Sequence, residues 1–129
     1  MFSTEVTISN LYLNYGGHVG DIGYVALAQE ARMRWLKSRG VTEIDLGDGV
    51  GYVIASGRME YKGESVHGDV LAIEIACANL KSRGFDFLYK MVNVKTGRVA
   101  AAGDTSQVFY DYRIKKVSQV PPKFKEWFF

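Results

Sequence analysis

The chain has 129 residues, 47% hydrophobic and 23% charged, so it can bury the core of one globular domain without disulfides or a structural metal. A formal net charge of +2 gives no strong attraction to nucleic acid or to a membrane surface, so we expect neither as a partner. The single cysteine, Cys77, excludes an internal disulfide and a cysteine-based metal site, and we expect no bound metal.

The first predicted element is a strand over residues 4–13, in which Val6 and Ile8 alternate with polar residues. A loop over residues 14–18 follows, because the glycine pair in it interrupts regular structure.

The only long helical pattern of the chain covers residues 22–38. Tyr24, Ala28, Ala31 and Trp35 recur at spacings of four, three and four, which draws one apolar stripe along a helix. We predict that this stripe packs on a sheet. Asp21 is expected to be the N-cap, Gly40 to end the helix in the left-handed conformation, and Glu30 to pair with Arg34 on the outer face.

Four longer strands are predicted after the helix, over residues 52–62, 70–80, 85–94 and 99–112. In the first of them Val53, Ala55, Met59 and Tyr61 are expected to share one face. A further short strand is considered over residues 43–46, Gly97 is expected in a hairpin turn, and Gly103 at a bulge or bend. A short helix is predicted to start at the proline pair 121–122.

A strand, one long helix and then a run of antiparallel strands indicate the α+β class and a single domain over residues 1–129. Because a sheet covered on one face by one helix leaves edges to protect, we expect a homodimer or homotetramer. The N-terminus has no signal-peptide pattern and no apolar run is long enough to span a membrane, so we expect a cytoplasmic protein.

Residues 14–32 carry a motif: Asn14, two residues, Gly17-His18-Val19, and then a helix with Tyr24-Val25 and Glu30-Ala31-Arg32. This motif resembles the hotdog-fold acyl-CoA thioesterases of the 4-hydroxybenzoyl-CoA thioesterase type. The resemblance covers nearly the whole chain. It implies a long central helix wrapped by an antiparallel sheet of about five strands.

The resemblance also implies a site at the start of the helix, where unpaired backbone N–H groups can polarise a thioester carbonyl. The residues expected to bind substrate are Gly17, Val19, Gly20, Tyr24, Met59 and Tyr61. In the resembling family a carboxylate beside the helix start is the nucleophile or general base. It lies four residues before the histidine, and this chain has Asn14 there.

Three residues are therefore candidates for catalysis: Asp21, Asn14 and His18. Asp21 is the only acid beside the helix start, although a helix cap alone would explain it. His18 is either a base or part of the pocket wall, and Asn14 is either a loop residue or a group that positions water.

The expected function is hydrolysis of an acyl-CoA thioester to a carboxylic acid and a free thiol. Coenzyme A is then part of the substrate and no separate cofactor is needed. An acyl-carrier-protein thioester is the other substrate class that fits. The alternative function is a non-catalytic hotdog protein that binds an acyl thioester or a related ligand. A thioester dehydratase is a further alternative, but the chain has no matching acid–base motif.

Overall fold

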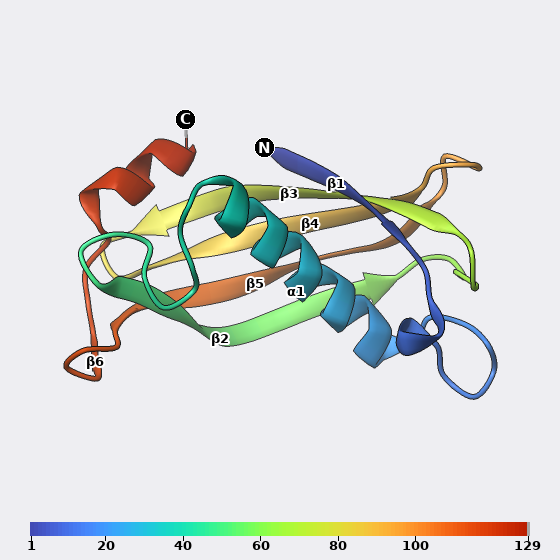
Figure 1. Ribbon diagram of the computed structural model, residues 1–129, viewed down its shortest axis with the longest axis horizontal. Helices are drawn as coiled ribbons and strands as arrows, with labels where there is room; N and C mark the ends of the chain where they lie inside the picture. Colours follow the sequence, from blue (N-terminus) through green and yellow to red (C-terminus); the bar gives the residue numbers. More distant parts are fainter. Residues whose placement is uncertain (129) are drawn as a thin grey trace.

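The computed structural model describes residues 1–128 and consists of one long helix on one face of an antiparallel sheet (Figure 1). Its elements are β1 (Phe2–Thr7), η1 (Asn10–Tyr12), α1 (Asp21–Ser38), β2 (Val50–Tyr61), β3 (Val70–Lys81), β4 (Gly84–Asn93), β5 (Val99–Asp111), β6 (Lys116–Val117) and η2 (Pro122–Phe128). This is the α+β architecture expected of a hotdog fold. The described sheet has six strands rather than about five, because the two-residue β6 pairs with β5.

The strand order in the sheet is β1-β3-β4-β5-β2, so β2 and β3 are not neighbours although they follow one another in the chain. Instead β2 pairs with β5 over nearly its whole length. The connection that leaves β2 at the edge of the sheet must therefore cross past β5 and β4 to reach β3. On its way it passes the start of α1 (Figure 1).

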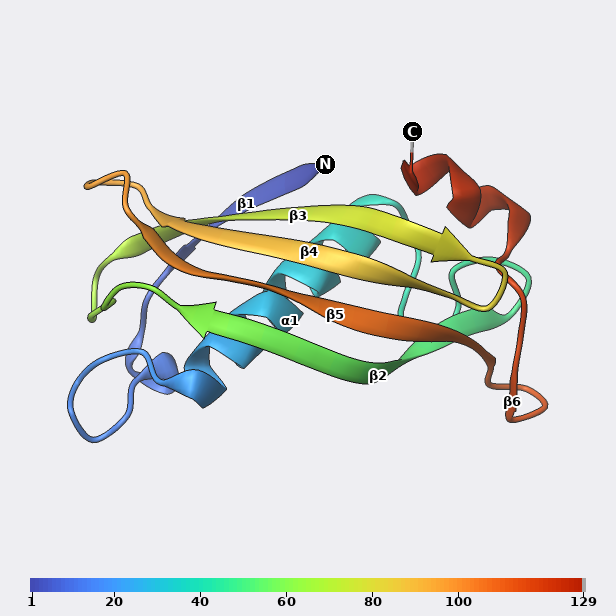
Figure 2. The same ribbon diagram turned by 180° about the vertical axis from the view of Figure 1, so that it is seen from behind.

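The core lies between α1 and the covered face of the sheet. All four residues of the predicted helical stripe are buried, from Trp35 at 3% exposure to Ala31 at 0%. Alternate residues of the central strands face them, with Leu71, Ile73 and Ile75 from β3 and Phe85, Phe87, Tyr89 and Met91 from β4. The predicted Glu30–Arg34 pair is also present at 3.0 Å. Figure 2 shows the opposite face of the sheet, which none of the helices described over residues 1–128 covers.

A bulge in β2 corrects the predicted face of that strand. The register against β5 shifts between Ile54 and Ser56, so the inward positions are even-numbered before the bulge and odd-numbered after it. Tyr52 is consequently buried and Val53 exposed, contrary to the prediction, whereas Met59 and Tyr61 do lie on the helix side. No register shift occurs at Gly103, where a bulge or bend was expected; it pairs regularly with Met59.

The first strand is shorter than predicted, because the chain turns into η1 after Ser9 and Leu11 is 91% exposed. No strand forms over residues 43–46: the Asp45 carboxylate accepts hydrogen bonds from the Gly47 and Gly49 amides and holds a turn there.

Gly40 and Gly97 adopt positive φ angles of 71° each, as predicted. The terminal helix is the 3-10 helix η2, whose Trp127 ring lies 4.7 Å from that of Trp35. None of the described helices is long and apolar enough to cross a membrane.

Candidate active site

The loop before α1 is organised by the side chain of Asn14. Its Oδ1 atom accepts hydrogen bonds from the amides of Gly16 at 3.0 Å and His18 at 3.4 Å. Gly17 sits at the tip of this loop with a φ angle of 76°, a conformation that suits glycine. The His18 and Val19 backbones then form bridges to Val66 and Leu13, so the chain enters the helix in a fixed direction.

The helix start differs from the prediction by one residue. Gly20 is the N-cap, with an extended backbone and no side-chain capping bond, and Asp21 is the first helical residue. The expectation that Asp21 is the N-cap is therefore wrong, because its own backbone is already helical. Two consequences follow for chemistry. The exposed Asp21 carboxylate is not engaged in capping, and the first amides of α1 have no partner within the helix.

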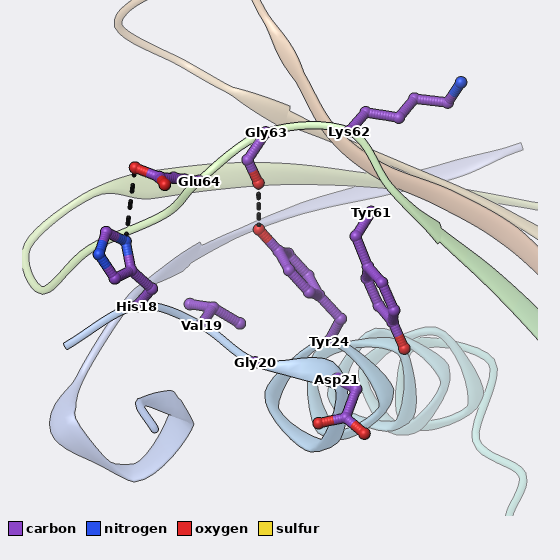
Figure 3. A pocket seen from close by; sticks show the side chains of 9 residues that line it. All are labelled: His18, Val19, Gly20, Asp21, Tyr24, Tyr61, Lys62, Gly63 and Glu64. Carbon is purple, nitrogen blue, oxygen red and sulfur yellow. Dashed lines mark hydrogen bonds and ion pairs between the residues drawn. The ribbon is translucent and has the colours of Figure 1, made fainter. Parts of the chain in front are cut away.

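A cavity of about 490 Å³ opens at this helix start (Figure 3). One wall comes from the loop and α1, and the other from the end of β2 and the connection after it. Its lining residues are His18, Val19, Gly20, Asp21, Tyr24, Tyr61, Lys62, Gly63 and Glu64. The cavity is therefore built from two segments that lie about 40 residues apart in the sequence.

Tyr24 holds these two walls together. Its hydroxyl donates to the Gly63 carbonyl at 3.0 Å and lies 3.0 Å from the Ser65 hydroxyl, which then acts as donor to it. Ser65 is completely buried, and its carbonyl accepts a hydrogen bond from the Val19 amide. The Tyr24 ring stacks on Tyr61 with centroids 5.6 Å apart. Burial raises the pKa of Tyr24, so this hydroxyl stays protonated at neutral pH.

His18 and Glu64 face each other across the cavity mouth. Figure 3 shows the imidazole ring and the carboxylate pointing toward one another, while the Asp21 carboxylate extends from the start of α1 away from them. The His18 Nδ1 and Glu64 Oε2 atoms are 3.6 Å apart, too far for a good hydrogen bond, and that Nδ1 is buried without a partner in residues 1–128. The Glu64 side chain is 82% exposed and can move closer.

The structure brings six of the nine predicted site residues to this cavity: His18, Val19, Gly20, Asp21, Tyr24 and Tyr61. It does not bring Asn14, Gly17 or Met59 to the lining. Asn14 lies behind the wall, with its Nδ2 atom 3.0 Å from the place where a Cβ on Gly20 would stand. Met59 instead lines a second cavity farther along α1.

Sequence reasoning missed Glu64 and treated Lys62 only as one of several surface cations that could meet the phosphates of coenzyme A; both are charged residues of the opposite wall. No local pattern distinguishes them from other surface charges, since their position depends on the path of the connection from β2 to β3. Cys77 is no candidate nucleophile, because burial raises the pKa of its thiol to about 12.

Solved structures of low sequence identity share this fold over nearly its whole length. A 1,4-dihydroxy-2-naphthoyl-CoA thioesterase from Synechocystis is 17% identical with a TM-score of 0.85, over 96% of this chain and 92% of that one. A hypothetical protein from Aquifex aeolicus is 21% identical with a TM-score of 0.86, over 98% of both chains. A hypothetical protein from Staphylococcus aureus in complex with CoA is 13% identical with a TM-score of 0.84, over 97% of this chain and 79% of that one.

No curated protein matches the sequence. The model of one protein family, however, matches residues 10–128, which include the helix-entry loop, α1 and every strand after it. The chain therefore belongs to the thioesterase-like superfamily.

Proposed function

We propose that this protein hydrolyses acyl-CoA thioesters at the cavity beside the start of α1. The observation that carries the proposal is the meeting of unpaired helix amides with three ionisable side chains in one cavity, Asp21, His18 and Glu64. Membership of the thioesterase-like superfamily supports the same activity. The fold shared with a CoA thioesterase and with a CoA-bound protein supports coenzyme A as the thiol part of the substrate.

The proposed reaction needs two kinds of group. Amides of the first turn of α1 donate hydrogen bonds to the thioester oxygen and stabilise the charge that develops on it. Asp21 takes a proton from a water molecule, whose oxygen attacks the carbonyl carbon. The carbon–sulfur bond then breaks, the acid is released, and the departing thiolate takes up the proton. His18, oriented by Glu64, is the other group able to serve as this base.

Asn14 stands where the resembling family has its aspartate, and its Oδ1 atom is already occupied by two loop amides. In this proposal it shapes the loop instead of acting as a base. If neither Asp21 nor His18 replaces the missing acid, the cavity binds thioesters without cleaving them, which is the alternative function.

We also propose that the protein assembles as a homodimer, or as a tetramer of such dimers, through the free edge of β2. Among the described strands, β2 pairs only with β5 and leaves its other side unpaired. Apolar side chains are exposed along it and on the adjacent flank of α1, namely Val53, Ile54, Tyr61, Ile22 and Val25. An edge of this kind is normally covered. A stable contact should bury more than about 1,000 Å², and a monomer in light scattering at micromolar concentration would contradict the assembly.

A cytoplasmic location is part of the same proposal. The chemistry of the substrate supports it, as does Cys77, a free thiol whose chain has no second cysteine to form an internal disulfide.

The decisive test measures thiol release from a panel of acyl-CoA thioesters. We expect turnover by the parent protein and a fall in kcat of about 10²–10⁴ in Asp21→Asn, the usual effect of removing a positioned base. Asp48→Asn is the matched control, because Asp48 is exposed, lies outside the cavity lining and has a φ of 56° that asparagine tolerates.

The other outcomes also discriminate. Full activity of folded Asp21→Asn would remove Asp21 as the base, and the His18→Ala and Glu64→Gln variants would then be expected to lose activity. Binding of a thioester by the parent protein without any turnover would contradict hydrolysis and favour the binding function.

A further inference from the structure

A second cavity of about 270 Å³ lies beside the first, between α1 and the second half of β2. Tyr61 lines both cavities, so they are adjacent along one side of the helix. Figure 1 shows the last part of β2 running next to the first part of α1 at this place. The walls of the second cavity are mostly apolar and include Val25, Ala28, Ile54 and Met59. A thioester held at the start of α1 would direct its acyl group along this side.

The lining also contains Arg58, Asp104 and Thr105, and Arg58 and Asp104 form an exposed ion pair at 3.8 Å. Arg32, which is only 4% exposed, is the buried charged residue of this cavity. Its Nη1 atom donates to the Tyr89 hydroxyl at 3.0 Å, and its Nε lies 3.5 Å from Glu43 Oε1. That Nε is buried and has no hydrogen-bond acceptor among residues 1–128. A buried N–H without an acceptor is costly, so it is rarely left in that state without a reason.

The positive charge of Arg32 is already balanced by a neighbouring carboxylate. Glu43 offsets the guanidinium charge and is itself fixed by the Tyr52 hydroxyl at 2.8 Å. Burial by itself lowers the pKa of Arg32, but the Tyr89, Tyr52 and Glu43 side chains together raise it by more. The net pKa is therefore raised, and the guanidinium stays charged. What is missing is an acceptor in hydrogen-bonding geometry, and an uncharged oxygen of a bound acyl group would supply it beside the Glu43 carboxylate.

We infer that Arg32 selects acyl groups that carry a hydroxyl or carbonyl oxygen at a distance from the thioester, in preference to plain hydrocarbon chains. Asp21 and Arg32 are separated by about 16 Å along the axis of α1, and helical side chains lean toward the N-terminus, which shortens that span. The oxygen is therefore expected toward the far end of a medium-length acyl group. This inference rests on the proposed function, because it places the thioester at the start of α1.

The test compares saturated acyl-CoA thioesters with their ω-hydroxy counterparts in three lengths, hexanoyl, octanoyl and decanoyl. We expect kcat/KM to favour the hydroxylated member by about tenfold at one or more of these lengths, as for a hydrogen bond to a charged group. The preference should lie in KM as much as in kcat, since Arg32 contacts the acyl group and not the reacting carbon.

Two variants separate recognition from folding. Glu43→Gln removes the ion pair but not the donor, and Glu43 lies outside the cavity lining, so this control should keep the preference. Arg32→Met combined with Glu43→Gln removes the donor without leaving the partly buried Glu43 carboxylate unpaired, and it should abolish the preference.

Equal kcat/KM values within every pair in the parent protein would overturn the inference while leaving thioester hydrolysis standing, and this holds even if the double variant fails to fold. A preference that survives in the folded double variant would also overturn it. If no thioester is hydrolysed at all, the proposed function fails. Dissociation constants of the same pairs, measured by calorimetry, then decide the inference by the same criterion.

Discussion

Replacement of Tyr24 by phenylalanine tests how the two walls of the candidate active site are held together. The change removes one hydroxyl and leaves the ring, which still stacks on Tyr61. Two partners lose their hydrogen bond, the carbonyl of the exposed Gly63 and the hydroxyl of Ser65, and Ser65 has no exposure to water. We therefore expect a loss of stability without a loss of packing.

The expected loss is about 1–3 kcal/mol, the range for leaving a buried polar group such as the Ser65 hydroxyl unsatisfied. Chemical unfolding in urea, followed at one fixed protein concentration, measures it as a lower midpoint with an unchanged slope. Because Gly63 and Glu64 line the cavity, kcat/KM for thioester hydrolysis should fall as well. Tyr15→Phe is the matched control, since Tyr15 is fully exposed and should change neither quantity.

A double-mutant cycle with Ser65→Ala isolates the hydrogen bond. If the bond is formed, the combined variant should lose less stability than the sum of the two single variants, by about 0.5 kcal/mol or more. An unchanged midpoint in Tyr24→Phe, or strict additivity in the cycle, would refute the view that Tyr24 ties the connection after β2 to the helix start.

The remaining predictions concern the helix face, the loop and alkaline pH. Ala31→Leu should overpack the fully buried contact of α1 with the sheet and lower the free energy of unfolding by about 1–3 kcal/mol; an unchanged urea midpoint would mean that the helix face is misassigned. Asn14→Asp should leave the rate of thiol release unchanged, because Asn14 lies behind the cavity wall and its Oδ1 atom accepts two loop amides; a raised rate would show that the loop can place an acid where the resembling family has one. Burial raises the pKa of Tyr52 and of Tyr89, so the folded state holds these protons more tightly than the unfolded state. Their contribution to stability is complete below pH about 10 and is lost as the pH rises above it; Tyr52→Phe should flatten this loss in thermal unfolding, and an identical alkaline profile would contradict it.

The sequence alone determined the elements whose pattern is local. The stripe from Tyr24 to Trp35 follows from the 3.6-residue period of a helix, and the burial of Phe85, Phe87, Tyr89 and Met91 from the two-residue period of a strand. The glycine conformations at Gly40 and Gly97 follow from turn geometry, which is also local. The start of the helix was predicted within one residue, because both Gly20 and Asp21 are reasonable caps and only the backbone angles distinguish them.

Only the tertiary structure decided which distant segments meet. Strand pairing depends on contacts between residues far apart in the chain, so no local pattern placed β2 beside β5 or revealed the bulge that turns Tyr52 inward. The same path carries Glu64 to within 3.6 Å of His18 and closes the cavity. Arg32 was visible in the sequence only as one residue of a helix motif. Its burial and its lack of an acceptor arise because α1 lies against β2 and β4, where packing of the whole domain and not helical periodicity sets the surroundings.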